Sequence, residues 1–272
     1  MSLLKKEAPP NGAGQKSGVA GPEIAISCGM SHKGHVRQVN EDSYLDLPQK
    51  GLWVVADGMG GHEAGDVASQ LIVDSLRQAP LNGSLSDRLN EIEDILDRVN
   101  RSLLERSQAQ AKSQDAPSSA TGRPPVIGST IALLAAEDRH VGVVMWAGDS
   151  RVYRLRRGCA LEQVSSDHSQ IATYLKQGLI TPEEAKTHPE RHIITRAVGS
   201  QDELFLEADL CELAPGERFL LCSDGLTRHL SDAEIGRLLG EGTPQEACQK
   251  LIDLTLSRGA KDNVTTLVVE IA

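Results

Sequence analysis

The sequence predicts an α+β protein in which mainly antiparallel sheets are covered by helices. Its apolar runs are short and come in groups, and the helical patterns lie between these groups instead of alternating strictly with single strands. The 272 residues can bury a sizeable core, and 39% apolar and 24% charged residues are typical of a folded chain. We expect an N-terminal tail over residues 1–22, rich in Gly, Pro, Lys and Ser, and a single domain over residues 23–272.

The first half of the chain predicts two strands followed by two helices. Residues 23–30 alternate apolar with small or polar side chains, and residues 51–57 form a short apolar run that ends in Asp-Gly. Apolar residues at three- and four-residue spacing predict amphipathic helices over 62–79 and 85–103. Residues 107–125 are polar, small and proline-bearing, which predicts an exposed loop.

The second half predicts more strands with a lobe inserted between them. Three β-rich runs, 128–136, 140–149 and 151–158, favour an antiparallel meander. Residues 167–200 contain two short helical segments, one opening with the helix-start signal Thr-Pro-Glu-Glu, and predict a flap-like lobe. Two further strands, two helices and a closing strand are expected over residues 204–213, 217–225, 231–239, 243–259 and 263–272.

Charge and hydropathy exclude several classes of protein. A net charge of −10 argues against a general nucleic-acid or anionic-membrane binder, because such partners select basic surfaces. The longest strictly apolar run, residues 131–136, is far below the roughly 18 residues that span a bilayer, so we expect no membrane insertion. The N-terminal lysines precede Glu, Pro and Gly, unlike a secretory signal. Five cysteines without CxxC spacing favour buried thiols in a reducing cytoplasm.

Aspartates recur where the predicted strands stop or start. They are Asp57, Asp149, Asp224 and Asp262. A buried strand cannot hold an unpaired carboxylate cheaply, but its end can project one into a cleft. If Asp57, Asp224, Asp262 and Glu41 converge, their four charges repel unless cations bind among them.

Two divalent cations would balance four carboxylates. Oxygen ligands favour Mg²⁺ or Mn²⁺, and a pair of such ions suits hydrolysis of a phosphomonoester. The alternative is that each Asp-Gly is only a hairpin turn. However, Asp57 leads into a Gly-rich loop and a helix, and Asp224 into LTRHLSDAE, so neither simply joins two strands. Gly58 would let the backbone bend so that its carbonyl faces a metal, and Gly225 would permit a sharp exit after Asp224.

Eight segments follow one another in a distinctive order. They are RQVNEDSY (37–44), VVADGMGGHEAGDVAS (54–69), GST (128–130), AGDSRVYRLR (147–156), DHS (167–169), ITRAVG (194–199), CSDGLT (222–227) and DNVT (262–265). In order and spacing they resemble the bacterial serine/threonine phosphatases of the metal-dependent protein phosphatase 2C family, over about residues 23–272. The resemblance implies a four-layer α-β-β-α sandwich of two mainly antiparallel sheets, with a metal site at one end.

The resemblance also implies a set of metal ligands. Asp57 would bridge two Mn²⁺ or Mg²⁺ ions, with the Gly58 carbonyl on one, while Asp224 and Asp262 complete the other. Glu41 would lie at or just behind the first ion, with Asp42 and Asn263 behind the ligands. Asp149 resembles the residue that helps Asp224 hold a weaker third ion.

Arg37 resembles the family's phosphate-binding arginine. A guanidinium can grip two phosphate oxygens and so orient the phosphorus for attack. The alternative is a surface arginine paired with Glu41 or Asp42.

His62 is a candidate general acid for the leaving oxygen, because a histidine titrates near neutral pH. In the animal-type motif the catalytic histidine directly follows Asp-Gly, where this chain has Met59. A helix-capping or surface role for His62 therefore stays open, as does protonation by a metal-bound water. His188 and His192 resemble flap residues, either structural or close to substrate.

The resemblance implies hydrolysis of phosphoserine and phosphothreonine on proteins by a metal-activated water, which reverses Ser/Thr kinase signalling. A phosphorylated protein, either a Ser/Thr kinase or one of its substrates, would be the partner of a cytoplasmic monomer. Two alternatives stay open: a phosphorylation-dependent binding protein that has lost catalysis, and a metallophosphatase for a small metabolite. The presence of Asp57, Asp224 and Asp262 argues against the first alternative.

Overall fold

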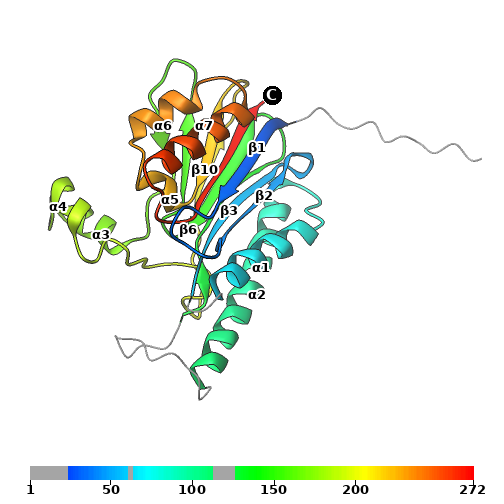
Figure 1. Ribbon diagram of the computed structural model, residues 1–272. Coiled ribbons are helices and arrows are strands. Elements are labelled where there is room, and N and C mark those ends of the chain that lie inside the picture. The colour runs from blue at the N-terminus through cyan, green and yellow to red at the C-terminus, as the bar shows by residue number, and fades with distance from the viewer. Residues whose placement is uncertain (1–23, 61–63, 113–125) are drawn as a thin grey trace, which may run out of the picture.

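The computed structural model describes residues 24–60, 64–112 and 126–272. Two antiparallel sheets pack face to face, and helices cover both outer faces, which confirms the predicted four-layer sandwich (Figure 1). The predicted tail (1–22), the candidate acid His62 and residues 113–125 of the predicted loop lie outside the described residues.

The first sheet, sheet A, has the strand order β1-β11-β10-β7-β8, and all its pairings are antiparallel. Its strands are β1 (Ala25–His32), β7 (Arg151–Leu155), β8 (Glu162–Gln163), β10 (Arg218–Cys222) and β11 (Val264–Ile271). The closing strand β11 lies between β1 and β10, so the first and last strands of the described chain pair within one sheet.

The second sheet, sheet B, has the order β2-β3-β5-β6-β9, with β4 paired to the end of β3. Its strands are β2 (Asp42–Leu47), β3 (Leu52–Met59), β4 (Gly128–Ser129), β5 (Ile131–Ala136), β6 (Val141–Ala147) and β9 (Glu207–Glu212). A short 3-10 turn, η1 (Pro48–Lys50), joins β2 to β3.

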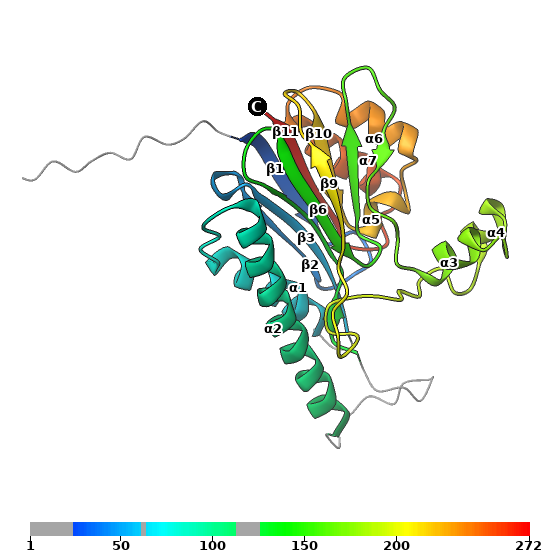
Figure 2. The ribbon, with the colours of Figure 1, turned by 180° about the vertical axis from the view of Figure 1, so that it is seen from behind.

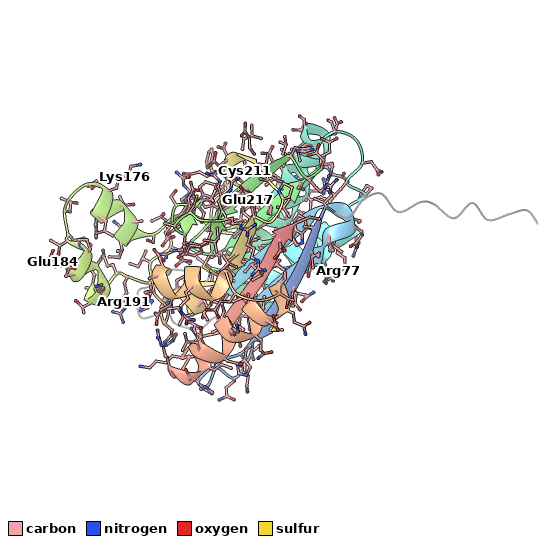
Figure 3. The ribbon with its side chains drawn as sticks, turned by 90° about the horizontal axis from the view of Figure 1, so that it is seen from above. Arg77, Lys176, Glu184, Arg191, Cys211 and Glu217 are labelled. Atoms are coloured by element: carbon pink, nitrogen blue, oxygen red, sulfur yellow. The ribbon has the colours of Figure 1, made fainter. Side chains whose placement is uncertain are left out.

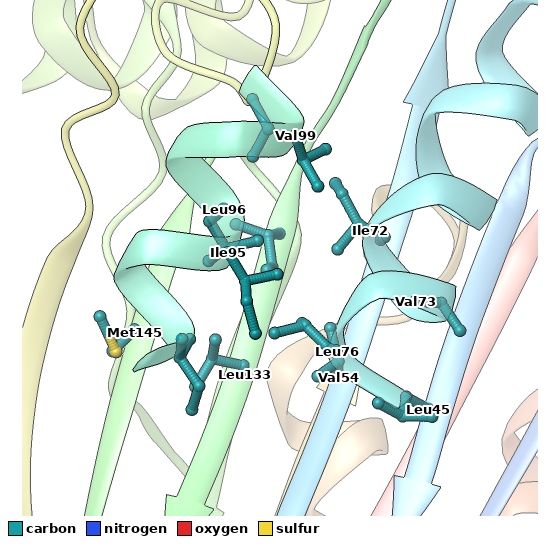
Figure 4. Packing of buried hydrophobic residues seen from close by; sticks show 14 of the residues in the cluster. Leu45, Val54, Ile72, Val73, Leu76, Ile95, Leu96, Val99, Leu133 and Met145 are labelled. Atoms are coloured by element: carbon teal, nitrogen blue, oxygen red, sulfur yellow. The ribbon is translucent and has the colours of Figure 1, made fainter. Parts of the chain in front are cut away.

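Alternating side chains on the strands build the layers. On β3, Trp53 and Val55 face the space between the sheets, while Val54 and Ala56 face the helices. Helices α1 (Ala64–Gln78) and α2 (Leu85–Lys112) cover sheet B, and their side chains meet strand residues such as Val54 (Figure 4). Sheet A is covered by α5 (Asp224–Thr227), α6 (Asp232–Leu239) and α7 (Pro244–Ser257).

The predicted lobe contains two short helices that project from one end of the sandwich (Figure 2). They are α3 (Gln170–Lys176) and α4 (Pro182–Thr187). Ser169 caps α3 through the N–H of Ala172, and Thr181 forms a reciprocal capping box with Glu184. No helix in the described ranges is both long and apolar enough to cross a bilayer.

Three expectations about strands and helices were wrong. Three strands precede α1 and not two, because β2 lies between the two strands that were expected. Residues 107–112 are helical, because α2 continues to Lys112 through a segment of Gln, Ala and Lys that favours helix. The expected meander is broken: β5 and β6 pair in sheet B, but β7 pairs with β10 in sheet A. The chain crosses between sheets at Gly148, whose φ of 119° favours glycine and whose missing Cβ would lie 2.6 Å from the Thr130 side chain.

Candidate active site

A cavity of roughly 1110 Å³ is lined by residues of the lobe and of the loops and strand ends next to it. Its lining comes from the loop before β2, the end of β3, the start of α5, the loop before β11 and the lobe. Seven of the predicted site residues line it: Arg37, Glu41, Asp57, Gly58, Asp224, Asp262 and Asn263. Asp149 lines an adjoining cavity of 330 Å³ that shares Asp224.

Asp57 lies inside β3, which continues to Met59, and not at the end of the strand as the sequence suggested. Its backbone is held on both sides by the GST segment: the N–H of Asp57 donates to Thr130 Oγ1 at 3.0 Å, and the N–H of Thr130 donates to the Asp57 carbonyl at 2.9 Å. The Ser129 hydroxyl donates to the same carbonyl. These bonds give the GST segment a role in positioning Asp57.

Asp149 lies at the crossover between the sheets. The neighbouring Ser150 shares a 2.6 Å hydrogen bond with Thr130, which links the crossover to the residues that hold Asp57. Asp149 Oδ1 is buried and has no hydrogen-bond partner among the described residues. Burial and the charge of Asp167 raise the pKa of Asp149 to about 6.

Asp42 connects three segments that carry site residues. Its Oδ2 accepts hydrogen bonds from Ser223 and Thr265, each at 2.7 Å. Ser223 lies between the end of β10 and Asp224, and Thr265 lies near the start of β11, shortly after Asn263. The buried Asp42 carboxylate therefore ties β2 to the end of β10 and the start of β11. The sequence analysis missed Ser223 and Thr265; the only available signal was that each stands within three residues of a predicted ligand.

The carboxyl groups that line the cavity and those that lie close behind it perturb one another. Asp57 lies directly opposite Asp42 in the pairing of β2 with β3. Burial, followed by the charges of Asp42 and Asp224, raises the pKa of Asp57 well above its usual range. Burial and Asp149 raise the pKa of Asp224 to about 8, and burial raises that of Asp42 to about 6. Additional positive charge would favour the ionised forms of these groups.

Two arginines supply part of that charge. Arg37 contacts Asp262, with Nε 2.9 Å from Oδ1, and not Glu41 or Asp42 as the surface alternative expected. Burial alone would lower the pKa of Arg37, but its hydrogen bond to Asp262 raises it. Arg228, which the sequence analysis overlooked, lies between two predicted ligands: its guanidinium contacts Asp224 and also Asp262, the latter at 2.8 Å.

Two glycines allow close backbone approach. A Cβ on Gly58 would lie 1.9 Å from the carbonyl oxygen of Gly65, and a Cβ on Gly225 would lie 1.9 Å from that of Asn263. Neither glycine has a positive φ, so packing, and not a left-handed turn, excludes a side chain. The Asn263 amide accepts from the N–H of Glu41 and donates to the carbonyls of Lys33 and Val39, which holds the loop that carries Arg37.

The two lobe histidines lie in different surroundings. His192 lines the cavity, whereas His188 packs edge-on against Tyr174 with ring centres 5.6 Å apart. His192 therefore lies close to the cavity, whereas His188 contributes to packing within the lobe.

The floor of the cavity fits Mn²⁺ or Mg²⁺ by its chemistry. Its donors are carboxylate and carbonyl oxygens, and repulsion among the carboxylates favours a bound cation. In the described parts of the chain, no group of three or more His, Cys, Asp or Glu side chains could hold a metal ion as it stands. Asp224 and Asp262 contact guanidinium groups instead, so metal binding requires these side chains to exchange partners.

Comparisons with known proteins agree with this architecture. The family model for protein phosphatase 2C matches residues 28–266. Serine/threonine protein phosphatase PstP of Mycobacterium tuberculosis is 35% identical over 241 residues, which are 89% of this chain and 44% of PstP. This chain therefore spans less than half the length of the first curated relatives it matches. Protein phosphatase PhpP of Streptococcus pneumoniae is 31% identical over 91% of this chain and 96% of its own length.

Solved structures are also similar to this chain in sequence and in fold. A structure described as PppA, a key regulatory component of T6SS in Pseudomonas aeruginosa, is 41% identical with a TM-score of 0.80, and the match covers 92% of this chain and 98% of that one. The catalytic domain of PstP in complex with two manganese ions is 31% identical with a TM-score of 0.76, covering 92% and 99%. Fold, motif order and family match together make this chain a member of the protein phosphatase 2C family.

Proposed function

We propose that this chain is a metal-dependent protein phosphatase that hydrolyses phosphoserine and phosphothreonine. The observation that carries the proposal is the cavity floor, where Asp57, Asp224 and Asp262 lie beside Arg37. Asp57, Asp224, Asp262, Glu41 and the Gly58 carbonyl would hold two Mn²⁺ or Mg²⁺ ions, and Asp149 would join Asp224 at a weaker third. Two such ions acidify a water and neutralise charge on the reacting phosphate.

The residues of the chain supply positioning. Thr130 and Ser129 hold the backbone of Asp57, so its carboxylate stays at the floor of the cavity. Arg37 is exposed at the mouth of the same cavity and can donate two parallel hydrogen bonds to phosphate oxygens once Asp262 binds a metal. The presence of all three aspartates in one cavity favours a catalyst over a binding protein that has lost catalysis.

We also propose the setting in which the enzyme acts. Its partners would be phosphorylated proteins, either a Ser/Thr kinase or that kinase's substrates, and it would act as a monomer. All five cysteines are free, and Cys211, Cys222 and Cys248 are buried, which supports a reducing cytoplasm.

Phosphate release from a phosphothreonine peptide tests the proposal. We expect release with Mn²⁺ or Mg²⁺, little without metal, and a loss of at least about 100-fold in Asp57→Asn. Asp253→Asn, an exposed acid on α7 that is bonded only to Gln249, serves as the matched control and should keep full activity. Equal activity in Asp57→Asn would overturn the proposal, and faster turnover of a phosphorylated metabolite would reassign the substrate.

A further inference from the structure

The rim of the cavity carries unpaired positive charge in a protein whose net charge is −10. Lys186 lies in the last turn of α4, and Arg191 lies in the lobe just after that helix. Lys261 lies between α7 and β11. All three side chains are exposed and line the same cavity as Asp57. Figure 3 shows Arg191 on the lobe, which stands out from the body of the molecule.

These three cations differ from the other charged residues of the site. Arg37 and Arg228 are bound to aspartates, but within residues 24–60, 64–112 and 126–272 neither lysine nor Arg191 forms an ion pair with a carboxylate. Among the residues that the structure describes, the Arg191 side chain forms one hydrogen bond, to the His188 carbonyl at 3.3 Å. Their charges are therefore available to a ligand.

Two histidines near the rim respond to this positive potential. After burial, the charges of Arg228 and Arg191 lower the pKa of His192. Burial and then Arg228, Arg258 and Lys261 lower the pKa of His229. Both histidines line the cavity, and they come from different segments, so cations act at two separate points of its rim.

We propose that Lys186, Arg191 and Lys261 form an anion subsite that selects phosphopeptides with a second negative group close to the phosphate to be removed. This inference rests on the proposed phosphatase function and names the substrate class of the same cavity. A glutamate or aspartate side chain and a second phosphorylated residue share the required chemistry. A flanking charge contacts the rim equally before and during reaction, so the subsite lowers KM and leaves kcat unchanged.

Three phosphothreonine peptides test the subsite: one with neutral flanks, one with flanking glutamates and one with a second phosphothreonine. We expect KM for the neutral peptide to exceed that for the anionic peptides, with a difference that shrinks as salt rises. Each of Lys186→Gln, Arg191→Gln and Lys261→Gln should raise KM for the anionic peptides about two- to fivefold and leave the neutral peptide unchanged. Arg191→Lys should retain the preference, and the two anionic peptides show whether carboxylate or phosphate is preferred.

Lys176→Gln is the matched control, because Lys176 is an exposed lobe lysine at the end of α3 that does not line the cavity. Equal KM for all peptides in the parent protein, or equal loss on neutral and anionic peptides in the variants, would overturn the subsite. Fluorescence anisotropy of the same peptides with metal-free protein gives a reading that needs no turnover. Absence of phosphate release from every peptide contradicts the phosphatase function, whereas release that ignores flanking charge contradicts only the subsite.

Discussion

The two ends of strand β10 both carry buried acidic residues, but they are compensated differently. At its start, Glu217 is 5% exposed and binds Arg154 through Nε and Nη2 at 2.8–3.1 Å, with Arg156 at 3.3 Å. Beyond its end, Asp224 lies among Asp57 and Asp149, and the pKa of each is raised. One end is a completed ion pair; the other keeps a negative charge that the chain balances only in part.

This contrast separates a structural ion pair from a site built for an outside ligand. A buried carboxylate costs free energy unless it is paired, so a fold that gathers several carboxylates at one place with only part of their charge balanced sacrifices stability there. The fully compensated end should therefore govern stability, and the partly compensated end should govern metal binding and turnover.

The largest expected effect concerns activity at the partly compensated end. Asp224→Asn should reduce phosphate release by at least about 100-fold, because it removes a proposed metal ligand. The same change should leave the metal-free melting temperature at pH 8 unchanged or higher, because it removes a carboxylate that its neighbours repel. A calorimetric scan beside the activity assay measures both. A large drop in melting temperature would show that Asp224 has a structural role like that of Glu217.

The next effect concerns stability at the compensated end. Glu217→Gln leaves the Arg154 guanidinium buried without its counter-charge and should cost about 3 to 5 kcal/mol in the free energy of unfolding, measured by urea denaturation. The double variant Glu217→Leu with Arg154→Met should recover much of this loss, since it removes both charges. Turnover by the folded fraction should not change; a loss of Mn²⁺ binding would break the distinction between the two ends.

A smaller effect is the pH dependence of stability without metal. The carboxyl groups of Asp42, Asp149 and Asp224 have folded pKa values of about 6, about 6 and about 8, above the ordinary value of 3.8. The folded protein therefore holds these protons more tightly than the unfolded chain, so the free energy of unfolding should fall as pH rises from about 4 to about 8. Saturating Mn²⁺ should remove most of this fall. A stability that rises over this interval without metal would contradict the repulsion.

The smallest effect concerns Arg228, whose guanidinium contacts two of the proposed metal ligands, Asp224 and Asp262. Arg228→Gln should tighten Mn²⁺ binding about two- to fivefold in calorimetric titration, because a competing cation is removed. Arg237→Gln, which breaks the exposed pair between Arg237 on α6 and Glu241 just beyond the end of that helix, should not change it. Weaker binding in Arg228→Gln would mean that Arg228 orients the ligands and does not compete for them.

The sequence predicted most of the architecture because its patterns are local. Alternation, three-four spacing and cap signals located both pairs of covering helices and most strands. It did not predict that β7 leaves the sheet of β6, because apolar runs of similar length and composition fit either sheet. That crossover is what carries Asp149 to the site.

The candidate site was predicted from motif order, since Asp57, Asp224 and Asp262 are far apart in the chain and meet only in the fold. The supporting network was not predictable, because Ser223, Thr265 and Arg228 look like ordinary polar residues until the strands are placed. Whether Asp57, Gly58, Glu41, Asp149, Asp224 and Asp262 bind metal stays a prediction, as does phosphate binding by Arg37.

Calorimetric titration of the folded protein with Mn²⁺ at pH 7.5 tests the central claim most directly. We expect about two ions to bind per chain in the parent, and Asp57→Asn to lose at least one, because Asp57 is the proposed bridge between them. No Mn²⁺ binding by the folded parent, or the same stoichiometry and affinity in Asp57→Asn, would contradict the account.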